Sequence, residues 1–229
     1  MPRETFDREL QGLQDELLTL GSMVEQAITD SVASLKRRDR PWSERLIEQD
    51  RNMNAKRYAL EAKALTLIAS QQPVAGDLRT IAAVLSLAAE LERIGDYAKG
   101  IAKINLMMGD EPLLKPLIDV PRMADKTRDM LHRALQAFAE RDVELARAIP
   151  LEDDEVDSLY DQVYRELLTY IMSNPRNIDR ATYLLWVAHN LERAADRVVN
   201  ICERVVFTVT GKLVEITSEG ENEITYQGK

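Results

Sequence analysis

Two short acidic segments, one hundred positions apart, carry the residues of this chain that are best suited to chemistry. Each contains Glu-x-x-x-Asp, as Glu92 with Asp96 and as Glu192 with Asp196. On a helix, residues four apart lie one above the other, so each copy presents two carboxylates as a pair. Like charges at this spacing repel, and we expect a cation or a nearby arginine to neutralise them. A solvated acidic helix face would explain a single copy; the repetition favours a functional pair.

A second polar row precedes each pair by one predicted helix. Asp50 and Asn54 form this row in the first half, and Asp153 and Asp157 form it in the second. If consecutive helices pack antiparallel, each row faces an acidic pair. We name the two groups the first-half acidic set (Asp50, Asn54, Glu92, Asp96) and the second-half acidic set (Asp153, Asp157, Glu192, Asp196), and we predict these eight residues as metal ligands. Residues 152–155 are equally compatible with a solvated acidic turn.

The donor types of both sets restrict the metal. Carboxylate and amide oxygens without thiolate or imidazole suit Mg, Ca, Mn or ferric iron and disfavour structural zinc. The neutral Asn54, where the second half has Asp157, gives the first set less negative charge. We therefore expect the two sites to differ in affinity.

Catalytic signatures are missing from the sequence. A di-iron oxidase needs Glu-x-x-His, but Asp129 and Trp186 lie three residues before His132 and His189. The chain has no Gly-rich phosphate loop, Gly-x-Ser-x-Gly elbow or kinase motif, and the lone Cys202 lies in an apolar segment typical of a core. We predict a protein that is not an enzyme. Two alternatives stay open: a metal-dependent hydrolase or oxidase acting on a phosphate-containing small molecule, and a purely structural helical scaffold.

The elements that position the acidic sets are helices with apolar residues three and four apart. We expect helices at residues 5–38, 42–70, 74–108, 121–140, 143–173 and 178–210, with a kink near Pro150 in the fifth. Positions around 32–54 match positions around 135–157 with a displacement of 103, whereas the third and sixth helices match with a displacement of 100. The predicted fold is all-α, with two tandem, sequence-related three-helix bundles.

This pattern divides the chain into a first repeat at residues 1–112, a second at 113–212 and a polar tail at 213–229. We expect the tail to be poorly ordered, although residues 213–217 and 224–226 have a strand-like composition.

Composition narrows the class of protein further. The net charge of −9 and pI near 4.9 argue against a nucleic-acid binder, which needs Lys and Arg to neutralise phosphates. The sequence shows neither a signal peptide nor a membrane-spanning run. We expect a cytoplasmic protein.

Four segments together resemble the PhoU family. They are QQPVAGDLR at residues 71–79, LERIGD at 91–96, LERAAD at 191–196 and NICE at 200–203. The resemblance covers about residues 5–215 in family order. The tail beyond residue 215 matches no family pattern.

The resemblance implies a cytoplasmic negative regulator of the phosphate-starvation response and modulator of phosphate uptake. Such a protein links the ATPase subunit of the high-affinity phosphate ABC transporter to its sensor histidine kinase, and so associates with the membrane through partners. The family also implies a homodimer and metal binding, including iron clusters, at acidic motifs similar to those here. The implied cofactor is Mg, Mn or Fe.

Overall fold

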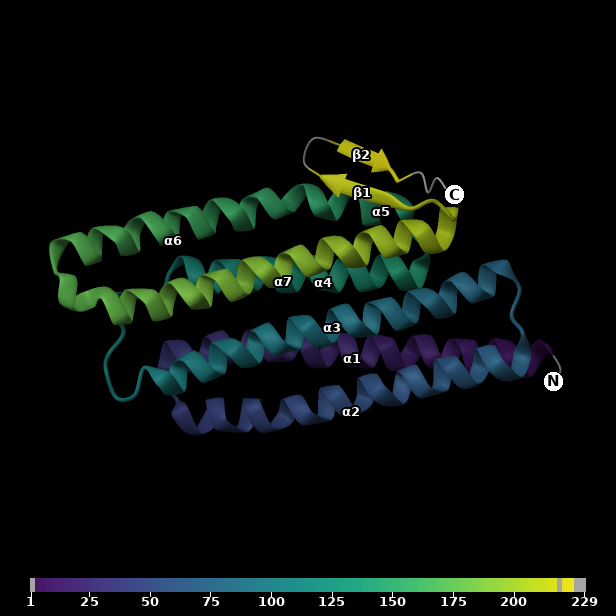
Figure 1. The fold of residues 1–229 in the computed structure, drawn as a ribbon, viewed down its shortest axis with the longest axis horizontal. Coiled ribbons are helices and arrows are strands. Elements are labelled where there is room, and N and C mark those ends of the chain that lie inside the picture. Colours follow the sequence, from purple (N-terminus) through teal and green to yellow (C-terminus); the bar gives the residue numbers. More distant parts are fainter. Residues whose placement is uncertain (1–2, 218–219, 225–229) are drawn as a thin grey trace, which may run out of the picture.

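The computed structural model describes residues 3–217 and 220–224 of the chain. Long helices run along one common axis, and a small hairpin lies at one end (Figure 1). In chain order the elements are α1 (Arg3–Arg37), α2 (Arg40–Gln71), α3 (Ala75–Met107), α4 (Asp119–Glu140), α5 (Val143–Ala148), η1 (Ile149–Glu152), α6 (Asp153–Ser173), η2 (Pro175–Asn177), α7 (Ile178–Thr210), β1 (Val214–Thr217) and β2 (Gly220–Glu223). The all-α prediction is confirmed.

The same Arg-Asp turn joins the first two helices of each repeat. Arg38 and Arg141 both adopt a left-handed backbone, with φ of 55° and 57°. The following aspartates cap the next helix: Asp39 Oδ1 accepts from the backbone N–H of Trp42 at 2.9 Å, and Asp142 Oδ1 accepts from that of Leu145 at 2.9 Å. Each cap satisfies an N–H that has no partner inside the helix. The predicted displacement of 103 is thus visible as a repeated local structure.

The fifth predicted helix is interrupted where the kink was expected. A 3₁₀ segment containing Pro150 separates α5 from α6. Proline lacks the N–H that would continue the α-helical ladder, and a tighter 3₁₀ turn accommodates it. The break lets α6 begin at Asp153, so that Asp153 lies in the first turn of a new helix.

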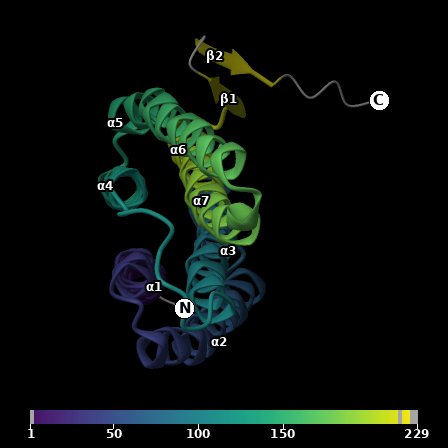
Figure 2. The same ribbon diagram turned by 90° about the vertical axis from the view of Figure 1, so that its left-hand side faces the viewer.

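The two bundles pack side by side through one shared core. Figure 2 shows α3 beside α7 in the middle, with α2 and α6 at opposite outer ends, and α1 packs against α4 on the flank. Apolar side chains of both repeats form a single buried cluster. Gly21 lets α1 and α4 approach closely, because a Cβ added there would lie 2.2 Å from Leu135 Cδ1. The halves are therefore joined by packing as well as by the chain.

The start of the tail is ordered, contrary to our expectation. Strands β1 and β2 pair antiparallel, and alternate side chains of β1, Val214 and Ile216, are buried against the helices. Two further contacts hold the hairpin: the Ile216 N–H donates to Glu203 Oε1 at 3.0 Å, and Arg147 pairs with Glu221 at 2.5 Å. Of the second strand-like segment, residues 225–226 lie outside the described residues.

Cys202 is fully buried in α7, as predicted. Burial raises the pKa of its thiol, which holds the sulfur in its protonated, weakly nucleophilic form.

Across residues 3–217 and 220–224, none of the helices offers a stretch that is both long and apolar enough to cross a bilayer.

Candidate functional site

The first-half acidic set lies where α2 packs against α3. Asp50, on α2, is 3% exposed, and Asn54 Nδ2 donates to its Oδ2 at 3.2 Å. Asp96, on α3, is brought to the same place through a shared partner. Lys99 Nζ lies 2.7 Å from Asp50 Oδ2 and 3.0 Å from Asp96 Oδ1. Glu92 is half-buried one turn before Asp96 on the same helix.

Lys99 was not among the predicted site residues. Its ammonium bridges α2 and α3 and supplies the counter-charge that we expected from a metal ion or an arginine. The hydrogen bond to Asp50 raises the pKa of Lys99, burial lowers it, and the hydrogen bond to Asp96 raises it further; the net result is a raised pKa, so Lys99 stays charged at neutral pH. A second internal ion pair follows one turn along α2, between Arg57 and Glu61 at 2.8 Å. The Lys99 ammonium thus offsets part of the negative charge of the first set.

The second-half acidic set lies on α6 and α7 and has four carboxylates where the first set has three. Burial, followed by the charges of Asp157, Asp196 and Glu192, raises the pKa of Asp153 to about 7. Burial and the Asp196 charge also raise the pKa of Asp157 and of Glu192. Asp153 and Asp157 lie on α6, which packs against α7, the helix of Glu192 and Asp196, so the four carboxylates are near enough to repel one another.

Cationic contacts to the second set are few in the described chain. Arg193 Nη1 donates to Asp196 Oδ2 at 2.8 Å. His189 Nδ1 lies 3.3 Å from Glu192 Oε2, but without hydrogen-bond geometry, and within residues 3–217 and 220–224 that oxygen is buried with no hydrogen-bond partner. At the position equivalent to Lys99, displaced by 100, stands Val199.

The carboxylates of the second set are hard oxygen donors of the kind that Mg, Mn and Fe accept, and an unpartnered buried oxygen is available. In the conformation described, however, no three His, Cys, Asp or Glu side chains of residues 3–217 and 220–224 surround a common point suited to a metal ion. The donor chemistry fits a metal ion, whereas coordination would require the side chains to turn toward one another.

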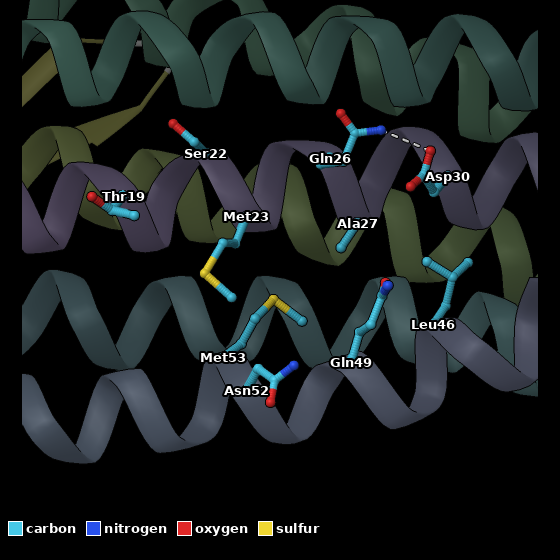
Figure 3. A pocket seen from close by; sticks show the side chains of 10 residues that line it. All are labelled: Thr19, Ser22, Met23, Gln26, Ala27, Asp30, Leu46, Gln49, Asn52 and Met53. Atoms are coloured by element: carbon cyan, nitrogen blue, oxygen red, sulfur yellow. Dashed lines mark hydrogen bonds between the residues drawn. The ribbon is translucent and has the colours of Figure 1, made fainter.

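The cavity shown in Figure 3 lies elsewhere, between α1 and α2, with a volume of about 470 Å³. Met23 and Met53 face each other across it, and Gln26 donates to Asp30 at 2.8 Å at one side. Its other lining residues are Thr19, Ser22, Ala27, Leu46, Gln49 and Asn52. With one carboxylate and no basic group among these ten residues, the cavity offers no paired acid and base for catalysis.

Comparison with known proteins places this geometry in a family. The model of the PhoU domain matches the chain twice, at residues 17–104 and 120–205, and each match contains one complete acidic set. The chain belongs to the PhoU family. The PhoU domain thus accounts for both helical bundles and for their duplication.

Curated PhoU relatives align along nearly the whole chain. A phosphate-specific transport system accessory protein PhoU homolog of Clostridium acetobutylicum is 35% identical and covers 94% of this chain and 99% of the relative. The PhoU accessory protein of Escherichia coli strain K12 is also 35% identical, over 90% of this chain and 86% of the relative. Identity at this level across both repeats indicates the same fold throughout.

Solved PhoU structures agree with the architecture. The phosphate transport system regulatory protein PhoU of Streptococcus pneumoniae has a TM-score of 0.85 at 31% identity, and covers 92% of this chain and 100% of its own. PhoU of Pseudomonas aeruginosa has a TM-score of 0.85 at 32% identity, over 90% and 99%. The prediction of two tandem three-helix PhoU-like bundles is confirmed.

Proposed function

We propose that this PhoU-family chain is a non-enzymatic regulator of phosphate transport. In this role it holds off the phosphate-starvation response when phosphate is plentiful, and it links the ATPase subunit of the phosphate ABC transporter to the sensor histidine kinase. The observation that carries the proposal is the match of the PhoU domain to both halves, together with relatives named as accessory proteins of phosphate-specific transport.

The proposal includes metal binding at the second-half acidic set. Burial and the charges of neighbouring carboxylates raise the pKa of Asp153, Asp157 and Glu192, and a divalent or ferric ion (Mg, Mn or Fe) would relieve the repulsion within the set. A cation that binds only the folded arrangement stabilises it by mass action. If the ion draws α6 and α7 together, it also biases the surface offered to partners. Homodimer formation, a cytoplasmic location and association with the membrane through partners belong to the same proposal.

The absence of catalysis is supported by chemistry at the candidate nucleophile. The Cys202 thiol is buried and protonated, and the second acidic set would use its carboxylates as ligands, which leaves them unavailable as a separate general base. No observation favours the hydrolase or oxidase alternative specifically.

A genetic experiment tests the regulatory role. In a strain from which the gene is deleted, a phosphate-starvation reporter should be active in phosphate-rich medium, and the wild-type gene should silence it. Complementation with Asp153→Asn/Asp196→Asn should leave the reporter at least partly active. Glu4→Gln/Glu9→Gln, which removes two exposed charges from α1, is the matched control and should silence it. A reporter that stays silent in the deletion strain would refute the regulatory role.

A further inference from the structure

The two acidic sets differ in what faces them, although the fold repeats. In the first half, Lys99 reaches from α3 to the buried Asp50 on α2, at 2.7 Å, and also contacts Asp96 at 3.0 Å. In the second half, the equivalent position is Val199, which brings no charge to Asp153 or Asp196. The repeats have therefore diverged at a position that changes the charge balance of each set.

The Lys99 ammonium contacts Asp50 and Asp96, whose carboxylates a metal ion at this set would need as ligands. Asp50 has a side chain that is only 5% exposed, and a carboxylate so well buried is costly unless it is paired and hydrogen-bonded. Lys99 and Asn54 together supply that pairing on the same oxygen, Asp50 Oδ2. A divalent ion bound to Asp50 Oδ2 would have to displace the Lys99 ammonium, because the two positive charges would otherwise repel each other at short range.

We propose that the Lys99 ammonium is the resident cation of the first-half acidic set, and that this set consequently takes no metal ion. The first half is then held together permanently by a cation tethered to α3. Only the second half responds to metal in solution. The part of this proposal that concerns metal rests on the proposed function. The part that concerns the ion pair between Lys99 and Asp50 does not.

The neutral Asn54 agrees with this assignment. A lysine brings one positive charge where a divalent ion brings two, so fewer carboxylates are needed around it. The first half has Asn54 and Lys99 where the second has Asp157 and Val199. Asn54 removes one negative charge and Lys99 adds one positive charge, so the first set has less repulsion for an external cation to relieve.

A thermodynamic cycle on chelator-treated protein tests the ion pair without any metal. Lys99→Met should lower the folding equilibrium constant about tenfold or more, because it leaves Asp50 buried and unpaired. In the Asp50→Asn background the same change should cost much less. Lys103→Met, an exposed lysine one turn further along α3, is the control and should have little effect. Independent, additive effects of Lys99→Met and Asp50→Asn in urea unfolding would overturn the proposal.

Binding of Mn²⁺, measured by equilibrium dialysis, tests the consequence for metal. Asp96→Asn should leave binding unchanged and Asp196→Asn should reduce it. Val199→Lys should weaken binding about tenfold by placing an ammonium in the second set, whereas Val199→Met, of similar length without charge, should not. Loss of bound Mn²⁺ in Asp96→Asn would overturn the proposal. If wild-type protein binds no Mn²⁺, Mg²⁺ or iron, the metal part of the proposed function fails, and the thermodynamic cycle alone decides whether Lys99 is the resident cation.

Discussion

Among the residues of the two acidic sets, Asp153 has the pKa that is shifted furthest from its ordinary value. Its pKa rises from an ordinary value of 3.8 to about 7, through burial first and then through the charges of Asp157, Asp196 and Glu192. At neutral pH the group is therefore partly protonated in the folded chain. A cation bound beside it would release that proton, so metal affinity at this set should increase with pH.

Stability of the metal-free protein should fall as pH rises from about 4 to about 7. In this range the folded state holds more protons than the unfolded state, because Asp153 has the higher pKa when folded. The stability from this group is complete below the unfolded pKa and is lost as pH passes the folded value. Between pH 5 and pH 8, in a chelator, we expect Asp153→Asn to remove about 1–2 kcal/mol of this decline, less than the full linkage value because the carboxyl is only partly buried.

Urea unfolding at several pH values makes this measurement. Asp161→Asn, which removes an exposed carboxylate of the same helix, is the control and should keep the wild-type slope. Equal slopes in wild type and Asp153→Asn would show that Asp153 does not titrate in this range.

Sequence reasoning paired the acidic residues by their spacing, because residues four apart lie on one face of a helix. It missed Lys99, because a lysine three residues after Asp96 resembles an ordinary surface residue until α2 is docked against α3. Comparing positions 99 and 199 in the two repeats would have given the signal. The charge balance of a site therefore depends on packing between helices, which spacing within one helix does not specify.

At the scale of the elements, the helices were predictable and the hairpin was not. The predicted last helix, residues 178–210, agrees with α7 at both ends, since its apolar period continues until the left-handed Gly211. Among the hairpin residues that the structure describes, two side chains, Val214 and Ile216, are buried within a polar segment. So few apolar residues give a weak periodic signal, and the hairpin depends on contacts with Glu203 and Arg147 that lie far away in sequence.

The hairpin should detach without unfolding the helices. Ile216→Asp places a charge in a buried position, at a cost greater than this small element can tolerate. We expect trypsin to cleave the variant after Lys212 much faster than wild type, while the helical circular dichroism signal is retained. Thr217→Asp, at an exposed position of the same strand, is the control. Parallel loss of helical signal in Ile216→Asp would mean that the hairpin is required for the bundles to fold.

At the scale of the whole molecule, the repeats share surfaces that neither could cover alone. Arg79 Nε of α3 donates to the Thr208 carbonyl of α7 at 3.4 Å, and Asn200 of α7 donates to Glu90 of α3 at 3.4 Å. These contacts flank the apolar faces that join the two bundles. The sequence predicted the duplication but not how the two halves pack, because a repeat pattern does not encode the geometry between repeats.

The shared core predicts that the chain unfolds as one cooperative unit. Produced separately, fragment 1–112 would expose apolar faces of α1 and α3, and fragment 113–212 would expose those of α4 and α7. Both would lose the close packing of Gly21 on α1 against Leu135 on α4. Since a bundle of about 100 residues buries proportionally less surface than the whole chain, we expect each fragment to bind the dye ANS and to melt without a sharp transition. Mixing equal amounts should restore a single transition and abolish dye binding. If either fragment melts sharply alone, the repeats are independent domains, and coupling between the proposed metal site of the second half and the first half would then require a partner protein that touches both.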